Sequence, residues 1–129
     1  MPASLRALRA IFLTGGALLF LVGATPVVPQ DTVAFLTYCE SHLEDCRVFV
    51  VGIDDVQKMI QLINHERACS LPWHMEFGTS IEAHKAAHQT ETIAILQWLK
   101  ANAAARSSTT KAAIVQAMAA LWPQECQKL

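Results

Sequence analysis

The sequence predicts an all-α fold, a compact four-helix domain held by two disulfides. Three observations lead to this prediction. Between Cys46 and Cys69, apolar residues recur at steps of three and four, which is the period of a helix. Three other stretches combine this period with helix-start signals. The four cysteines are an even count in a chain of 129 residues, as in small exported domains with two disulfides.

The central helix is predicted to run from Cys46 to about Asn64. The face expected to be buried consists of Cys46, Phe49, Ile53, Val56, Ile60 and Ile63. The stripe expected to meet water consists of Arg47, Asp54, Lys58 and Gln61. Gly52 costs about 1 kcal/mol of helix propensity relative to alanine, so we expect a neighbouring helix to approach closely there. The β-branched run at 48–51 also fits a strand, but the helical spacing continues past Gly52 and favours a helix.

The first helix is predicted to begin after Asp31, a candidate N-cap, and to run to about Leu43. Its inner side is expected to carry Phe35, Leu36, Cys39 and Leu43. Asp45 is then a candidate N-cap for the central helix. The first helix would therefore pack against the start of the central one.

The third helix is predicted to start at a capping box formed by Thr79 and Glu82 and to end near Asn102. One of its faces carries Ile81, His84, His88, Thr92, Ile95 and Leu99. A polar link at 103–110 offers Ser107, Ser108 and Thr109 as candidate caps for the last helix, which Pro123 stops after Trp122. The inward residues expected on that helix are Ile114, Val115, Met118, Leu121 and Trp122.

The N-terminal residues have the pattern of a signal peptide. Arg6 and Arg9 precede an apolar run at 11–22, and small residues lead to a cleavage site after Ala24. We expect a signal peptide at 1–24, a leader at 25–30 and the helical domain at 31–129. The alternative is an uncleaved anchor, but the run is short for a hydrocarbon core of about 30 Å. The exported chain would be periplasmic, with no membrane contact after cleavage.

The composition argues against nucleic-acid binding. The formal net charge is −1, and removal of Arg6 and Arg9 lowers it by two to −3. Nucleic-acid binding requires a basic patch, which this mildly acidic chain does not offer.

The sequence shows no catalytic constellation. His84 and His88 have the spacing of metal ligands on one helix turn, but Lys85 stands where the H-E-x-x-H zinc signature has glutamate. Two histidines on a half-buried helix face are more often packing residues. No serine has a nucleophile motif, and the thiols are better used in pairs. We therefore expect no metal, no other cofactor and no enzymatic activity.

The loop predicted at 66–78 is unusually rich in large apolar residues, which either fold back on the core or form a binding surface. The candidate partner-binding residues are Trp73, His74, Met75 and Phe77.

The order of these features resembles a known family. A helix with one cysteine (FLTYCE) is followed by a second cysteine and a glycine six residues later (CRVFVVG). The third cysteine precedes a proline loop and a capped helix (CSLPWHMEFGTS), and the last helix is rich in alanine and ends in proline and cysteine (AAIVQAMAALWPQEC). In these features, over most of 32–126, the chain is similar to the Rap/Tai immunity proteins of bacterial type VI secretion.

The resemblance implies a periplasmic, α-helical and often homodimeric protein. Such a protein binds and blocks a secreted peptidoglycan amidase effector and protects the cell that makes it. The alternative is a small periplasmic acid-stress chaperone that resembles the HdeA type. The five histidines make pH switching conceivable, but they titrate too high to respond to strong acid.

Helix geometry selects the disulfide pairs. A helix of about 18 residues separates Cys46 from Cys69 by about 27 Å, whereas bonded cysteines have Cα atoms within about 7 Å. A helical hairpin brings Cys39 to Cys46, and the returning last helix brings Cys126 to Cys69. The expected pairs are therefore Cys39–Cys46 and Cys69–Cys126. The alternative, Cys39–Cys126 with Cys46–Cys69, requires a kinked central helix.

Export gives the first testable prediction. Intact-mass measurement of protein from the periplasmic fraction is expected to show a chain that begins at Thr25, because cleavage follows Ala24. Recovery of only the full-length chain from the cytosol would contradict this prediction.

Overall fold

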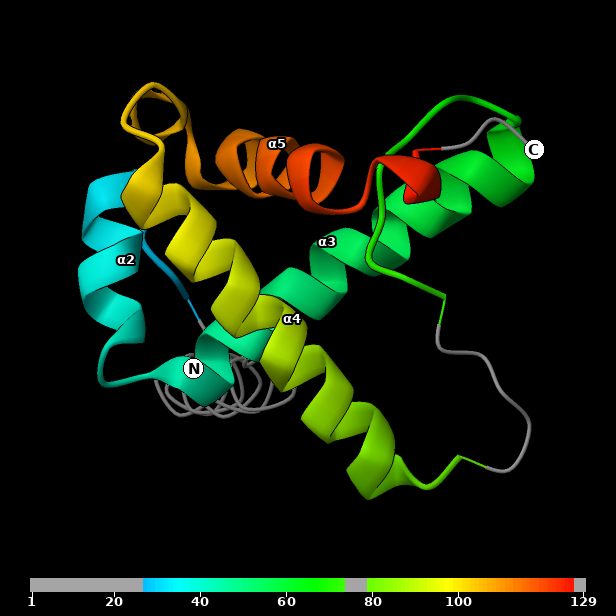
Figure 1. Cartoon of the computed structure of the whole chain (residues 1–129), viewed down its shortest axis with the longest axis horizontal. Helices are drawn as coiled ribbons and strands as arrows, with labels where there is room; N and C mark the ends of the chain where they lie inside the picture. Colours follow the sequence, from blue (N-terminus) through cyan, green and yellow to red (C-terminus); the bar gives the residue numbers. More distant parts are fainter. Residues whose placement is uncertain (1–26, 74–78, 127–129) are drawn as a thin grey trace, which may run out of the picture.

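The computed structural model describes residues 27–73 and 79–126. Four helices are described, α2 (Thr32–Cys39), α3 (Leu43–Asn64), α4 (Ile81–Ala101) and α5 (Thr110–Leu121), with 3-10 helices η1 (Ala105–Ser107) and η2 (Pro123–Glu125). α3 and α4 cross near the centre, and α2 and α5 pack against both (Figure 1). The all-α fold class is confirmed. No helix within the described ranges is both long enough and apolar enough for a membrane crossing.

The folded unit begins before Asp31, where the domain was expected to start. Val28 is buried in the core, so it belongs to the domain rather than to a separate leader. Thr110 fixes this segment, because its Oγ1 donates to the carbonyl of Pro29 at 2.8 Å and its N–H donates to that of Gln30 at 2.9 Å. The predicted signal peptide at 1–24 lies outside the described residues.

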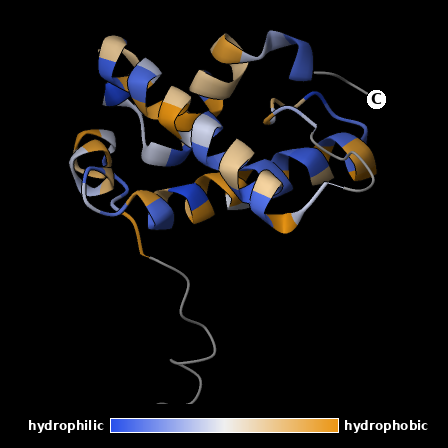
Figure 2. Cartoon of the chain, turned by 60° about the horizontal axis from the view of Figure 1, so that its bottom comes forward, coloured by the Kyte–Doolittle hydropathy of each residue, from blue (hydrophilic) through white to orange (hydrophobic). Residues whose placement is uncertain are grey.

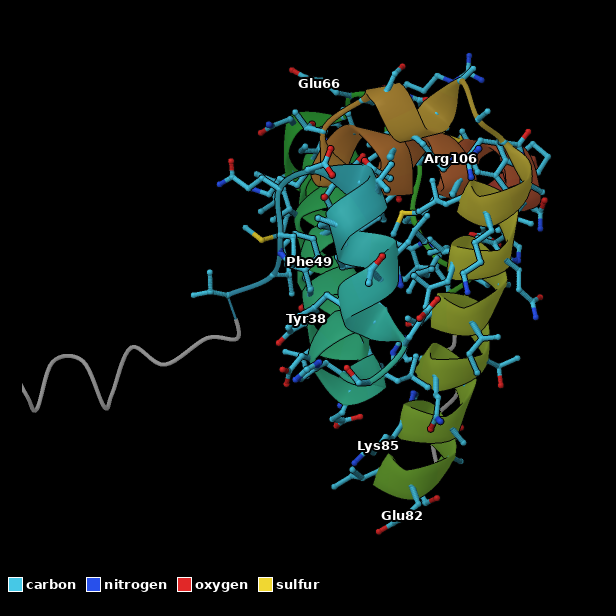
Figure 3. All side chains as sticks on the ribbon, turned by 90° about the vertical axis from the view of Figure 1, so that its left-hand side faces the viewer. Tyr38, Phe49, Glu66, Glu82, Lys85 and Arg106 are labelled. Carbon is cyan, nitrogen blue, oxygen red and sulfur yellow. A yellow bond between two sulfur atoms is a disulfide. The ribbon has the colours of Figure 1, made fainter. Side chains whose placement is uncertain are left out.

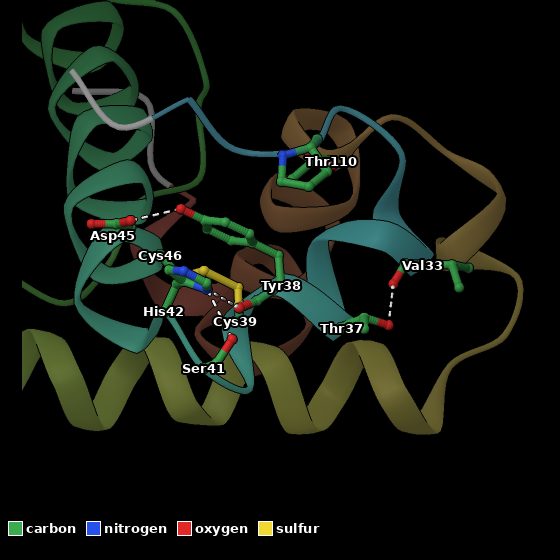
Figure 4. Close-up of a disulfide and its surroundings, with 10 residues drawn as sticks. Val33, Thr37, Tyr38, Cys39, Ser41, His42, Asp45, Cys46 and Thr110 are labelled. Atoms are coloured by element: carbon green, nitrogen blue, oxygen red, sulfur yellow. Dashed lines mark hydrogen bonds between the residues drawn. A yellow bond between two sulfur atoms is a disulfide. The ribbon is translucent and has the colours of Figure 1, made fainter. Parts of the chain in front are cut away.

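The turn between α2 and α3 is closed by the first disulfide. Cys39 and Cys46 have Cα atoms 5.9 Å apart, so the chain must reverse between them. α2 therefore ends at Cys39 and not near Leu43 as predicted, whereas its N-cap is Asp31 as predicted. His42 is the N-cap of α3, and the predicted cap Asp45 lies within the first turn instead, where it accepts a hydrogen bond from the Tyr38 hydroxyl at 2.6 Å (Figure 4).

The buried face of α3 differs from the predicted one. Cys46 and Ile53 are buried as expected, but Val50, Asp54 and Gln61 complete the buried set. The predicted inner residues Val56 and Ile63 are 54% and 66% exposed. Asp54 and Gln61, predicted to meet water, are each 1% exposed. The helix is therefore rotated about its axis relative to the prediction, because polar groups elsewhere in the chain bind two of its polar side chains.

Gly52 does not lie at a close helix contact. A Cβ atom placed on this residue would meet nothing within 4 Å, so the predicted close approach of a neighbouring helix is wrong. The glycine therefore has no packing role in the described part of the chain. Its helix propensity cost of about 1 kcal/mol is not offset by a contact there.

The N-cap of α4 is Ser80, whose side chain accepts a hydrogen bond from the N–H of Ala83, so the predicted box between Thr79 and Glu82 is displaced by one residue. The second half of α4 buries Thr92, Ile95 and Leu99 as predicted, together with Glu91 and Leu96. Ile81, which the spacing places on the same face, is exposed. The reason is visible in Figure 3, where the first turns of α4, marked by Glu82 and Lys85, project past the end of α2.

The last helix follows the prediction closely. Thr109 caps α5, and η2 begins at Pro123. Ile114 and Met118 are fully buried, and the other three expected residues are half-buried against the core. Hydrophobic and hydrophilic residues alternate along the helices (Figure 2), so burial depends on which side of each helix meets a neighbour. The largest fully buried apolar side chains are Phe35, Leu71, Ile95, Leu99, Ile114 and Met118.

Both predicted disulfides are confirmed. The second joins Cys69 to Cys126 across 57 residues, and the first spans only seven. α3 is one continuous helix of 22 residues, which excludes the alternative pairing. Two disulfides indicate an oxidising compartment of the kind that exported proteins reach.

Loop length predicts which disulfide matters more. In the chain-entropy model, replacing Cys69 and Cys126 with alanine should cost about 4 kcal/mol, and replacing Cys39 and Cys46 should cost about 2.5 kcal/mol. Urea unfolding of the two double variants measures both costs. A larger loss of stability from removing the Cys39–Cys46 disulfide than from removing Cys69–Cys126 would contradict the chain-entropy explanation.

Candidate functional site

Gln61 joins the two chain segments that the second disulfide connects. Its Nε2 donates to the carbonyl oxygen of Ala68 at 2.5 Å and to that of Glu125 at 2.8 Å. These acceptors belong to the residues directly before Cys69 and Cys126. One buried amide on α3 therefore fixes both backbones beside the sulfur bridge, and both hydrogens of the amide are used.

Asp54 fixes the next part of the same segment. Its Oδ1 accepts the N–H of Leu71 at 2.7 Å, and its Oδ2 receives the Nζ of Lys58 at 2.8 Å. Leu71 is fully buried in the core. Burial raises the pKa of the Asp54 carboxyl above 3.8, and this effect outweighs the hydrogen bonds from Lys58 and Leu71, which lower the pKa. The carboxyl thus positions the loop while carrying a desolvation cost.

Lys58 extends this network to the surface. Its Nζ lies 4.9 Å from the ring centroid of Trp73, within the range of a cation–π contact. Trp73 remains 40% exposed, so the indole covers the lysine on one side and meets solvent on the other. An exposed aromatic ring in contact with a neighbouring cation has the property expected of a binding contact.

Of the four predicted partner-binding residues, the structure places Trp73. His74, Met75 and Phe77 lie outside the described residues. The sequence suggested that this loop either packs on the core or forms a binding surface. Leu71 is buried in the core and Trp73 is exposed, so the described residues of the loop are of both kinds.

The predicted histidine pair lies on the first half of α4. His84 and His88 are both half-buried. The Nδ1 of His88 lies 3.1 Å from Oε2 of Glu91, and Glu91 is buried. Among residues 27–73 and 79–126, no three histidine, cysteine or acidic side chains gather as a metal site would require.

An apolar groove between α3 and α5 was missed by the sequence analysis. It has a volume of about 820 Å³, and its walls include Val48, Phe49 and Val56 from α3 with Lys111 and Val115 from α5. Gly52 also lines it. The sequence signal that could have indicated this surface is Gly52, a glycine within a helix that no internal contact explains.

The exposed side of α3 continues the groove. Val48, Val56, Met59 and Ile63 are 40% to 66% exposed and lie on the same side of the helix as Gly52. We call these five residues the outer stripe of α3. A contiguous apolar surface of this kind marks an interaction site more often than isolated apolar residues do.

Comparisons with protein-family models, with curated proteins and with solved structures find no match to this chain.

Asp54→Asn gives a prediction about pH. The raised pKa means that the folded state binds the Asp54 proton more tightly than the unfolded chain, so this group favours folding at low pH. Its contribution is lost as the pH rises from 3.8 through the folded-state pKa. Asparagine removes this dependence, and its amide oxygen can still accept the Leu71 N–H. We expect the stability of the variant, relative to the natural chain, to increase across this range.

Urea unfolding at a series of pH values from about 4 to about 7 measures this difference. Asp55→Asn is the matched control, because Asp55 is the exposed neighbour of Asp54. A relative stability of Asp54→Asn that stays constant or falls with rising pH would refute the assignment.

Proposed function

We propose that this protein is a periplasmic immunity protein that binds and blocks a secreted peptidoglycan amidase. It performs no chemistry and acts by covering the cleft of the amidase. The order of cysteines, helices and the proline loop supports this proposal through the family resemblance. Two disulfides in a small helical domain support its location in an oxidising compartment.

The observation that carries the proposed site is the exposed ring of Trp73 in contact with Lys58. Asp54 holds the N–H of Leu71, and Lys58 lies over the indole ring. The ring is therefore positioned before a partner arrives, which reduces the entropy lost on binding. Aromatic residues at the centre of an interface commonly contribute about 2 kcal/mol or more.

The alternative, an acid-stress chaperone, requires a fold that opens at low pH. Asp54 acts in the opposite sense, because its raised pKa favours the folded state as the pH falls. Glu44 acts in the sense that a chaperone needs, since the Arg47 guanidinium lowers its pKa to about 2. Glu44 is exposed, however, and exposed ion pairs contribute little to stability. The buried group therefore opposes the acid-driven opening that the chaperone alternative requires.

Trp73→Ala tests the proposed site. We expect the exported chain to inhibit the secreted amidase encoded beside its gene, and we expect the variant to inhibit it at least about tenfold less well. Inhibition is measured as release of amidase product from purified peptidoglycan against inhibitor concentration. Because Trp73 is partly exposed, the melting temperature should change little.

Ile93→Ala is the matched control, since Ile93 is a 37% exposed apolar residue on α4. It should leave inhibition unchanged. Failure of the natural chain to inhibit the amidase would refute the function. Equal inhibition by Trp73→Ala and the natural chain would refute the site alone.

A further inference from the structure

The outer stripe of α3 is regular in its spacing. Val48, Gly52, Val56, Met59 and Ile63 follow one another at steps of four, four, three and four. Val48 and Ile63 are 15 positions apart, so the helix rises about 22 Å between them and the stripe covers about four helix turns. In the described part of the chain no element covers it, since its large members are 40% to 66% exposed.

The groove lies beside the first half of this stripe. Phe49 and Val115 are half-buried side chains on its two walls, whereas Val48 and Val56 are more exposed. Phe49 also contacts the core through Phe35, with ring centroids 5.9 Å apart. The groove is therefore an apolar surface whose walls pack against the core.

Gly52 lies where the groove and the stripe meet. A side chain would fit there without any clash, yet the helix carries a glycine at a position that helix propensity disfavours. A glycine at an exposed helix position allows the backbone of a second helix to approach closely. This close approach, absent within the chain, is available to a partner.

The charge of the groove defines the partner further. Among the described residues that line it, Lys111 is the one charged residue, and the polar ones are Gln57 and Gln116. Lys111 is exposed, and no ion pair to it exists within residues 27–73 and 79–126. An apolar surface with a single cation is complementary to an apolar helix face that carries an acidic side chain.

We propose that the groove and the outer stripe of α3 bind one amphipathic helix of a protein partner. The helix is apolar on one face for about four turns and carries an acidic residue next to Lys111. This arrangement is the helix-in-groove mode of recognition, in which apolar side chains at helical spacing fill the groove. The surface lies on a different side of α3 from Lys58 and Trp73, because Val56 and Lys58 are only two residues apart in the helix. The inference does not depend on the partner being an amidase.

The test uses two model helices and the exported chain. Both are amphipathic peptides of about 18 residues with a leucine face, long enough to cover the stripe. One peptide carries glutamate at both ends of its leucine face, and the other carries lysine at both ends. Because the two ends of each peptide are alike, the comparison does not depend on the orientation in which the peptide binds. Fluorescence anisotropy is expected to show saturable binding of the glutamate peptide, tighter by about two- to fivefold than binding of the lysine peptide.

Two variants locate the binding. Gly52→Leu fills the groove and should weaken binding of both peptides at least about tenfold. The melting temperature should not fall, since leucine is the better helix former and the position is open. Ala86→Leu adds the same side chain at an exposed position on α4 and should leave binding unchanged. Lys111→Glu should reverse the preference, so that the lysine peptide binds more tightly.

The proposal is overturned if neither peptide binds below about 0.1 mM, if Gly52→Leu binds like the natural chain, or if Lys111→Glu keeps the original preference. It is also overturned if laurate, a single-chain fatty acid, occupies the groove and excludes the peptides. Self-association that Gly52→Leu abolishes, without peptide binding, would assign the surface to a second copy and refute the proposal as well.

Discussion

The structure depends on two buried polar side chains of one helix. Asp54 binds the backbone N–H of Leu71, 17 residues away in the sequence. Gln61 binds the backbone carbonyls of Ala68 and Glu125, which are 7 and 64 residues away. A buried backbone group without a partner costs about 1–3 kcal/mol, so the rotation of α3 that satisfies these groups is strongly favoured. The Cys69–Cys126 bond lies at the same place and holds the two segments covalently. Hydrogen bonds and disulfide thus enforce one arrangement.

This constraint also explains the surface of the molecule. If α3 turns its polar side chains inward, the apolar side chains on its other side must turn outward, because both stripes are fixed to one helix. Val56 and Ile63 are exposed for this reason, and Val48 and Met59 lie on the same side. The buried polar network and the exposed apolar stripe are therefore two consequences of one rotation. A helix that buried its apolar stripe would leave Asp54 and Gln61 in water and the backbone of the following segment unbound.

The features predicted well from the sequence are those with strict geometric limits. Helix length excluded Cys46–Cys69 and so identified the disulfides, and the caps Asp31 and Thr109 depend on residues only three positions away. The buried face of α3 was predicted wrongly because its polar side chains bind partners 17 and 64 residues distant, which periodicity does not reveal. The partner-binding site stays a prediction. Trp73 is exposed as a contact residue should be, whereas the groove between α3 and α5 depends on how two helices diverge. Of that groove, the sequence displays only the unexplained glycine.

The helix α3 positions both Trp73 and the groove, but it does so by different interactions. The loop residues before it are fixed by charge and hydrogen bonding, through Lys58 and Asp54, so the ring is set by polar contacts that cost desolvation. The groove is set by core packing through Phe49 and Val115 and involves no buried charge. A change of pH therefore acts on the Trp73 loop more strongly than on the groove, since protonation of Asp54 weakens its ion pair with Lys58 but not apolar packing. One long helix with a polar inner side thus supports two exposed surfaces with different physical sensitivities, and a partner that used both would bind with a pH dependence that comes from the loop.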